Sequence, residues 1–367
     1  MWIWYGVNYM NVCILSLAEK GGMIHYVSQL AAMLSKTNTV YLVASQKIRS
    51  DLNNDVNIIK IPVPTRYFSL TILKFNILLR AIDKINPDVV HITAKHPWLI
   101  FVLPFLRKYP LVATIHDVKL HRGEWHPIWA LSLWMLIKYA DRIFVHGTWA
   151  MSTLVDMGVS NNKITVIPHG DYSFFTKYPQ NHIKETNAVL YFGRIEDYKG
   201  LEYLIRAEPL ITEEIPDANI IIAGKGNFEK YRNLIGDANK FEIHNRFIPD
   251  EEVPYFFQRA KVIVLPYIEG TQTGIIPIAY AFKKPVVVTK VGSISEVVDD
   301  GKTGFIVPPK DEKALADAIV VILKDDKLRK QMGENAYKKM KEELSWDEIA
   351  ERTIEVYKNV IRDKSRK

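Results

Sequence analysis

Apolar runs alternate with helical patterns along this chain, and the alternation constrains the fold more than any other feature. The run NVCILSL (11–17) is continuously apolar, as expected of a strand buried on both faces of a sheet. Helical spacing follows over residues 21–36, and the same order repeats as far as the strand KITVIP (163–168). Strands separated by helices pair in parallel, so the first half is predicted to form a doubly wound α/β sheet.

The segment 169–187 interrupts this order with Gly, Pro and polar residues, which is typical of a linker. From AVLYFGR (188–194) the alternation begins again and continues to GFIVPP (304–309). A length of 367 residues also suits two cores better than one. We therefore expect two doubly wound, Rossmann-like domains, over residues 1–170 and 171–345, that face each other across a cleft.

Composition excludes several classes of protein. The single Cys13 rules out an intramolecular disulfide and is expected in a core, and no cluster of Cys and His suggests a structural metal. Residues 1–9 lack the basic region and cleavage site of a signal peptide, and Met10 opens a better first strand. The most apolar candidate for a membrane span, residues 127–137, is too short and is expected to be a buried or interfacial helix.

Charge is distributed unevenly between the two halves. Residues 1–170 hold 17 Lys and Arg against 9 Asp and Glu, a balance of +8, whereas the other 197 residues hold 31 against 32, a balance of −1. A basic half that is also rich in aromatic residues suggests association with a membrane surface or an anionic substrate. Scattered solvating lysines are the alternative.

Ligands of doubly wound sheets bind at the carboxyl ends of the strands, so the loops that follow strands are candidate sites. After the first strand, Gly21 and Gly22 open a helix whose backbone N–H groups suit an anion, with a simple tight turn as the alternative. After a later strand, His116 and Asp117 stand where a neutral imidazole could hydrogen-bond a hydroxyl or take a proton. The alternative is that Asp117 caps the next segment.

Two cations lie close together in the loop after the first strand of the second domain. Next to Gly193, Arg194 can bind phosphate oxygens through two nitrogens, and Lys199 adds a point charge. Both suit a diphosphate leaving group, whose developing charge they would stabilise as the bond breaks. The alternative is a solvated loop in which Lys199 pairs with Glu196 or Asp197.

Three further loops complete the candidate set. Gly224 and Gly226 form another turn after a strand. Glu296 stands where a loop enters a short helix, and it could bind a ribose or sugar hydroxyl or cap backbone N–H groups. Residues 267–288 read as a turn, an apolar helix and a Val-rich strand, the shape of a phosphate-binding loop, although Glu269 is their only carboxylate.

Taken in order, these motifs resemble the retaining nucleotide-sugar glycosyltransferases of family 4, which have the GT-B architecture. The resemblance covers nearly the whole chain, through the early GG turn, IHD, ITVIPHGDYSFF, YFGRIEDYKGLEYLIRA, IIAGKG and KPVVVTKVGSISEVVDDGKTGFIVPP. It implies that the first domain binds the acceptor, that the second binds a nucleotide-diphosphate sugar, and that a last helix (346–367) crosses back onto the first domain. It implies no metal or cofactor, because basic residues and helix N-termini replace them.

The resemblance also assigns roles to single residues. It implies a donor site that contains the diphosphate-binding pair Arg194 and Lys199, the phosphate-facing turn Gly21 and Gly22, His116 beside the donor sugar, and Glu296 as the acid of a GG..E segment that reads GSISE in this chain. We add the glycines at 193, 224 and 226 to the substrate-binding candidates because they lie in the matching turns.

The chain departs from the family within residues 267–288. Family members carry two glutamates eight positions apart, and the matching positions are Gly270 and Ile278. Glu269 lies one residue before the first of them. A branch of the family has T-Q-[ST]-G loops, and in this chain that loop supplies hydroxyl, amide and backbone N–H groups from Thr271, Gln272, Thr273, Gly274 and Ile275.

These features predict a retaining hexosyltransferase that moves a sugar from a nucleotide-diphosphate donor to a hydroxyl of a lipid-linked or cell-surface glycan precursor. Contacts to the base of the nucleotide are expected near Phe247 and Ile248. We expect cytoplasmic localisation, with the basic first domain peripheral on the membrane, and no nucleic acid partner. The alternatives are a GT-B nucleotide-sugar isomerase, epimerase or phosphorylase, or a non-catalytic sugar-nucleotide-binding homologue.

Overall fold

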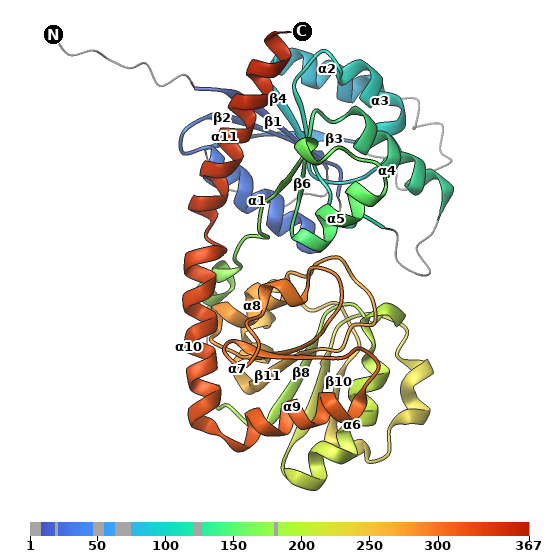
Figure 1. Cartoon of the computed structure of the whole chain (residues 1–367), viewed down its shortest axis with the longest axis vertical. Helices are drawn as coiled ribbons and strands as arrows, with labels where there is room; N and C mark the ends of the chain where they lie inside the picture. Colours follow the sequence, from blue (N-terminus) through green and yellow to red (C-terminus); the bar gives the residue numbers. More distant parts are fainter. Residues whose placement is uncertain are drawn as a thin grey trace, which may run out of the picture.

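The computed structural model describes residues 9–18, 21–46, 55–62, 75–119, 126–179 and 183–366. Its strands form two all-parallel sheets, one above the other in Figure 1. The first sheet has the order β3-β2-β1-β4-β5-β6-β7, with β1 (Asn11–Ser16), β2 (Thr39–Ser45), β3 (Val56–Ile61), β4 (Val89–Ile92), β5 (Leu111–Thr114), β6 (Arg142–Val145) and β7 (Ile164–Val166).

The second sheet repeats this plan with six strands. Its order is β10-β9-β8-β11-β12-β13, formed by β8 (Ala188–Phe192), β9 (Asn219–Ala223), β10 (Phe241–His244), β11 (Ala260–Leu265), β12 (Val286–Thr289) and β13 (Gly304–Val307). The order reverses between β1 and β4 in one sheet and between β8 and β11 in the other. Both reversals leave room at the carboxyl edge of the sheet, where ligands of such folds bind. The predicted class of two doubly wound α/β sheets is confirmed.

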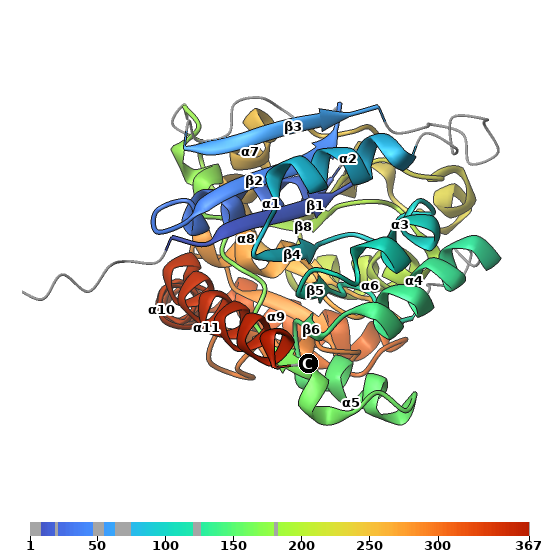
Figure 2. The ribbon, with the colours of Figure 1, turned by 90° about the horizontal axis from the view of Figure 1, so that it is seen from above.

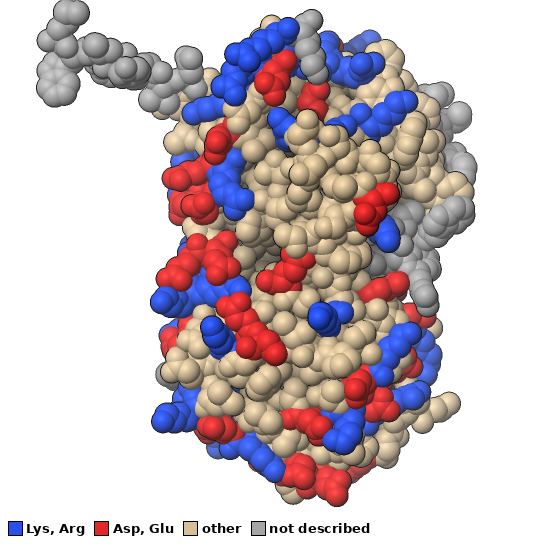
Figure 3. All heavy atoms as spheres, in the orientation of Figure 1, with Lys and Arg blue, Asp and Glu red and all other residues tan. Residues whose placement is uncertain are grey.

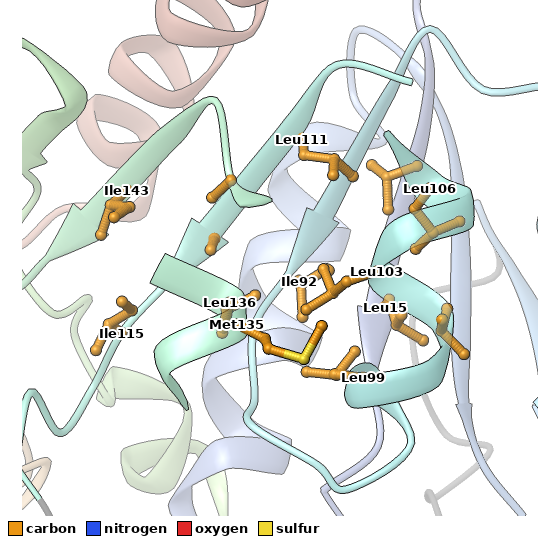
Figure 4. Close-up of a cluster of buried hydrophobic side chains, with 14 of the residues drawn as sticks. Leu15, Ile92, Leu99, Leu103, Leu106, Leu111, Ile115, Met135, Leu136 and Ile143 are labelled. Atoms are coloured by element: carbon orange, nitrogen blue, oxygen red, sulfur yellow. The ribbon is translucent and has the colours of Figure 1, made fainter. Parts of the chain in front are cut away.

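Helices cover both faces of the first sheet because successive residues of a buried strand point to opposite faces. From β1, Cys13 and Leu15 pack with α2 (Phe75–Ile85), α3 (Leu99–Leu106), α4 (Pro127–Tyr139) and α5 (Thr148–Asp156), while Val12 and Ile14 pack with α1 (Gly22–Leu34). Figure 4 shows Leu99, Leu103 and Leu106 of α3 and Met135 and Leu136 of α4 directed at the strands. The predicted burial of Cys13 is confirmed, and burial raises its pKa to about 12.

The second sheet has the same layering. On one face lie α6 (Leu201–Glu214) and α9 (Glu312–Lys324), which pack on Val189 and Tyr191 of β8. On the other face lie α7 (Val253–Arg259), α8 (Ile275–Ala281) and α10 (Asp326–Glu343), which pack with Ala188 and Leu190. Figure 2, seen from above, shows the helices of the first domain on both sides of its sheet.

The last helix, α11 (Trp346–Ser365), leaves the second domain and packs beside α1 on the first sheet (Figure 1). Its core side chains follow helical spacing and include Trp346, Ile349 and Tyr357. The Tyr357 hydroxyl lies 2.6 Å from Nδ1 of His91 in β4, so the helix is also anchored by a buried polar contact. Ser345 occupies the expected N-cap position, but its side chain makes no capping hydrogen bond.

The helix expected over residues 228–236 is a 3₁₀ helix over Glu229–Leu234, in keeping with its short length and the Gly that follows. Residues 1–8 and the start of the helix expected over residues 70–85 lie outside the described residues.

Among the helices that are described, none has the length and apolar character needed to cross a membrane. On the face shown in Figure 3, charges of both signs border an uncharged area in the upper domain.

Candidate functional site

Lys199 is a buried cation at the carboxyl edge of the second sheet. Its side chain follows β8, is 8% exposed, and donates a hydrogen bond of 2.5 Å to the hydroxyl of Tyr267, whose ring centroid lies 4.5 Å from Nζ. No carboxylate of a described residue is within ion-pair distance of it, and Asp197 pairs with Lys230 instead. The predicted alternative of a solvated ion pair therefore does not hold for Lys199. A buried ammonium group without a counter-charge is suited to an incoming anion.

Arg194 lies five residues earlier in the same loop but is far more open. Its side chain is 59% exposed, donates to the Tyr198 hydroxyl at 3.2 Å, and lies 3.9 Å from a carboxylate oxygen of Glu196. Such an exposed contact holds the guanidinium weakly. The structure thus places both predicted cations in one loop, where Lys199 is buried and preorganised and Arg194 is largely exposed.

The glycines of this region let two loops approach each other closely. A Cβ on Gly224 would lie 1.8 Å from the carbonyl oxygen of Gly193, and one on Gly226 would lie 2.1 Å from that of Ile195. Gly193 and Gly224 also have positive φ values of 117° and 156°. The structure therefore gives Gly224 and Gly226 a backbone role, because they hold the segment that carries Arg194.

The T-Q-T-G loop follows β11 and is linked to Lys199 through Tyr267. The Tyr267 hydroxyl lies 3.5 Å from Oγ1 of Thr273, and that oxygen accepts a hydrogen bond of 3.2 Å from the N–H of Ile275. Because the lysine donates to Tyr267, the tyrosine proton is left for Thr273. Gly274 is the N-cap of α8, so this chain of bonds joins Lys199 to the start of that helix.

The positions of the missing family glutamates have different surroundings. Ile278 is 5% exposed and packs in the core under α8, while a Cβ on Gly270 would lie 3.0 Å from Cδ1 of Ile294. Glu269 is attached through its backbone N–H to the carbonyl of Tyr198, at 3.4 Å. Thr271 is buried, and its carbonyl accepts from the N–H of Ser293 at 2.9 Å. Within residues 267–288, all of which the structure describes, Glu269 is the only carboxylate.

Tyr172 is a site residue that the sequence analysis missed. It lies in the linker, is buried, and donates from its hydroxyl to the carbonyl of Gly22 at 3.2 Å. A Cβ on Gly274 would lie 3.2 Å from the same hydroxyl oxygen. The turn at Gly21 and Gly22 therefore lies across Tyr172 from the start of α8, which brings two of the predicted phosphate-binding turns together.

His116 lies directly after β5 and belongs to a buried cluster of histidines. His146 follows β6 and His169 follows β7, and one ring nitrogen from each of the three lies within 4.8 Å of the others. Burial is the largest cause that holds the pKa of His116 well below its usual value, and it lowers the pKa of His146 to about 4 and that of His169 to about 3. All three imidazoles are therefore neutral at physiological pH. His146 could have been found from the sequence, since it follows a strand as His116 does.

This cluster is the one group of possible metal ligands in the described part of the chain. Three of its nitrogens are already used between protein atoms: Nε2 of His146 lies 3.0 Å from Nδ1 of His116, and Nδ1 of His146 lies 2.9 Å from the carbonyl oxygen of Ile167. No carboxylate belongs to the group, so a divalent cation would bring uncompensated charge into a buried place. The donor set fits a hydrogen-bonding role better than a metal.

A small pocket of about 30 Å³ lies between the domains beside this cluster. His146 and His169 line it from the first domain, and Gln272 and Thr273 line it from the second. The Oε1 atom of Gln272 is buried and has no hydrogen-bond partner among the residues that the structure describes. A larger hollow of about 630 Å³ lies at the opposite edge of the second sheet, near the amino ends of its strands, and none of the predicted residues line it.

Glu296 joins the two domains. Its two carboxylate oxygens each accept a hydrogen bond of 2.7 Å from the first N–H groups of α5, those of Thr148 and Trp149. The preceding residue, Gly147, has no room for a side chain, because a Cβ would lie 2.3 Å from Ser293. Of the two roles considered for Glu296, the structure favours the cap, and the helix that it caps belongs to the other domain.

Replacing Glu296 by alanine is expected to loosen this junction, at a cost of about 1 kcal/mol, the usual value of a lost helix cap. Glu296→Gln is the matched control, because it keeps one acceptor oxygen and removes the charge. We expect a lower melting temperature and a larger radius of gyration by small-angle scattering for the alanine variant, with the glutamine variant in between. Identical scattering and melting in all three proteins would contradict a joining role.

Phe247 and Ile248, expected near the base, follow β10. The ring of Phe247 is 65% exposed, whereas Ile248 is 8% exposed. An exposed aromatic ring at the carboxyl edge of the sheet can stack on a planar base. Ile248 instead contributes to the core of the second domain.

Comparison with known proteins agrees with this geometry. The family model described as Glycosyltransferase Family 4 matches residues 20–170, and the one described as Glycosyl transferases group 1 matches residues 174–339. A sucrose-phosphate synthase of Thermosynechococcus elongatus has the same fold, with a TM-score of 0.78 and 21% identity over 96% of this chain and 99% of that one. The Anabaena HepE complex with UDP-glucose superposes with a TM-score of 0.78 and 17% identity, over 96% of this chain and 100% of that one.

Curated relatives are similar over parts of the chain. An uncharacterized glycosyltransferase of Methanocaldococcus jannaschii is 34% identical over 179 residues. The match covers 47% of this chain and 45% of the relative, so the chain spans less than half the length of that relative. A glycogen synthase of Mycobacterium tuberculosis is 27% identical over 74% of this chain and 69% of its own. A phosphatidyl-myo-inositol mannosyltransferase of Mycolicibacterium smegmatis is 28% identical, over 58% and 54%. With two consecutive family models matched and the fold shared, the chain belongs to glycosyltransferase family 4, with the GT-B architecture.

Proposed function

We propose that this protein transfers a hexose from a nucleotide-diphosphate sugar to an acceptor hydroxyl, with retention of the anomeric configuration. The observation that carries the proposal is Lys199, a buried ammonium group without a described counter-charge, beside the turn that holds Arg194. A diphosphate supplies the missing negative charge. The Anabaena HepE structure contains UDP-glucose, which supports a donor of this class.

The proposed reaction breaks the bond between the anomeric carbon and a diphosphate oxygen, and forms one between that carbon and the acceptor oxygen on the same face. Lys199 and Arg194 stabilise the charge that develops on the leaving nucleotide diphosphate. The acceptor proton passes to a leaving phosphate oxygen, so no protein base is needed. His116 is neutral and positions the sugar. The scheme requires no metal or cofactor, and closure of the two domains excludes water.

Incubation with UDP-, GDP-, ADP- and dTDP-sugars tests this function. The thermal shift identifies the donor, because a ligand at 100 times its dissociation constant adds about 2.7 kcal/mol of stability. Proton NMR of the anomeric signal then separates the alternatives. Transfer or slow hydrolysis with retention supports a transferase, and formation of an epimer indicates an isomerase. Binding without any product indicates a non-catalytic homologue, the alternative suggested by Gly270 and Ile278 at the positions of the two family glutamates.

We also propose a lipid-linked acceptor reached from the cytoplasmic face of a membrane. The support is the surface of α3 and α4, where Phe105 is 58% and Trp134 is 54% exposed. These neighbouring helices contain no Asp or Glu, and Nζ of Lys138 lies 4.7 Å from the centroid of the Trp134 ring. Figure 2 shows α4 extending from the first domain beside α3. Exposed aromatic rings next to lysines suit the interface of an anionic bilayer. The mannosyltransferase relative is named for a lipid acceptor.

Replacing Trp134 and Phe105 together by serine is expected to weaken binding to vesicles of anionic phospholipid by at least about tenfold, because each side chain loses its apolar burial in the bilayer. Flotation of the protein with the vesicles measures the bound fraction. The matched control is Tyr255→Ser, an exposed ring of the second domain, which should float like the wild type. Equal flotation of all three proteins, or none of the wild type, would contradict a membrane surface here.

A further inference from the structure

We propose that His146 is a positioning residue. It fixes His116 in the tautomer that carries its proton on Nδ1, so that His116 keeps a bare Nε2 that can accept a hydrogen bond from a hydroxyl of the donor sugar. The identity of that ligand rests on the proposed function. The role of His146 towards His116 follows from the hydrogen bonds of the free protein.

The first step starts at the backbone of Ile167. Its carbonyl oxygen can only accept, and it lies 2.9 Å from Nδ1 of His146. Nδ1 of His146 must therefore carry a proton. The ring is buried and its pKa is lowered to about 4, so it is neutral at physiological pH and its second nitrogen, Nε2, has only a lone pair.

The second step passes this assignment to His116. Its Nδ1 lies 3.0 Å from the lone pair on Nε2 of His146, so it must be the donor of that bond. His116 is also neutral, since burial and the neighbouring histidines hold its pKa well below the usual value. Its Nε2 is then an unprotonated acceptor. The backbone of Thr93 is a hydrogen-bond partner of the ring that raises the pKa of His116, yet by distance and angle Nε2 makes no hydrogen bond in the described part of the chain and is buried.

The third step identifies the chemistry of the missing partner. His146, next to His116, lines the pocket between the domains together with Gln272, whose Oε1 atom is a second buried acceptor without a partner among the described residues. Two bare acceptors repel phosphate oxygens and are satisfied by groups that donate, such as sugar hydroxyls. Lys199 and Arg194 therefore bind the diphosphate, while the pair of His116 and His146 accepts hydrogen bonds from sugar hydroxyls.

The direct test is the tautomer of His116 in the ligand-free protein, read from ¹⁵N NMR of histidine-labelled samples. Free imidazole in water favours the proton on Nε2, so a signal with the proton on Nδ1 would show that the site imposes its choice. His116→Gln identifies the signal. His146→Phe keeps the ring and removes both nitrogens, and we expect His116 to revert towards the Nε2 proton. A wild-type His116 with its proton on Nε2, bonded to Thr93, would overturn the proposal.

Kinetics provide the second test. His116→Phe and His146→Phe are each expected to lower kcat/KM for the donor about tenfold, the value of one hydrogen bond of about 1.4 kcal/mol. The double variant should be no worse than either single one, because both remove the same bond. His146→Gln, whose carbonyl can again accept from His116, should recover part of the loss. Additive losses would refute the pairing. If no nucleotide sugar is turned over, the proposed function fails, while the NMR result still decides the role of His146.

Discussion

Lys199→Met is expected to lower turnover at least about 100-fold while the protein remains folded. Removing one preorganised group that stabilises transition-state charge typically costs a factor of 10² to 10³ in kcat. Methionine fills nearly the same space as the lysine side chain without its charge, so the packing against Tyr267 is kept. The expected loss is larger than for Arg194→Ala, since the arginine is 59% exposed and interacts through water of higher dielectric constant.

The measurement is steady-state turnover of the donor identified by thermal shift, together with the melting temperature of each variant. The matched control is Lys230→Met, which removes an ion-paired lysine from the neighbouring loop and should leave kcat within about twofold. Tyr267→Phe should have an intermediate effect, because the ammonium group stays but loses the hydroxyl that orients it. Wild-type turnover in Lys199→Met would remove the diphosphate assignment.

The features that were predictable from the sequence are local ones. The strand-helix alternation indicated two parallel sheets because burial on both faces leaves continuous apolar runs, and both sheets have this form. Arg194 and Lys199 were found because they lie in one loop after a strand. The glycine turns were found for the same reason, although Gly224 and Gly226 are explained by the close approach of backbones, which depends on a second loop.

The contacts that escaped prediction join residues far apart in the chain. The sequence does not distinguish a ribose ligand from a helix cap at Glu296, because its partners, the N–H groups of Thr148 and Trp149, come from the other domain. Tyr172 lies in a segment that reads only as a linker, and its hydroxyl gains a role where Gly22 and Gly274 meet. Periodicity and turn chemistry carry no information about such pairings.

The buried histidines predict a steep loss of stability in weak acid. Burial lowers the pKa of His91 and of His169 to about 3 and that of His146 to about 4, and holds that of His116 well below its usual value. In the unfolded chain all four return to about 6.5. Their folded pKa values are depressed, so the folded protein is favoured above pH 6.5, and that stability is lost as the pH falls from 6.5 towards the folded values.

The size of the effect follows from proton counting. Each histidine that is protonated only in the unfolded chain changes the free energy of unfolding by about 1.4 kcal/mol per pH unit, or about 2 kcal/mol at pH 5. Four together remove roughly 8 kcal/mol, which is comparable to the whole stability of a typical domain. The first domain contains all four, so we expect it to unfold between about pH 6 and pH 5. Carboxylates with lowered pKa values, such as Asp83, add their effect only in stronger acid.

Urea unfolding between pH 8 and pH 5 measures this slope, which should approach four protons at the acid end. His91→Gln is the matched test, because Gln keeps polar contacts available to Tyr357 and Thr114 but cannot be protonated. The variant can be less stable than the wild type at pH 8, because its packing differs. The pH dependence of its unfolding free energy must nevertheless correspond to one proton fewer. A smaller loss of stability between pH 8 and pH 5 therefore distinguishes titration of His91 from a change in packing. An unfolding free energy that stays constant from pH 7 to pH 5 would show that the histidines are protonated in the fold. The neutral imidazoles on which the His146 proposal depends would then be lost as well.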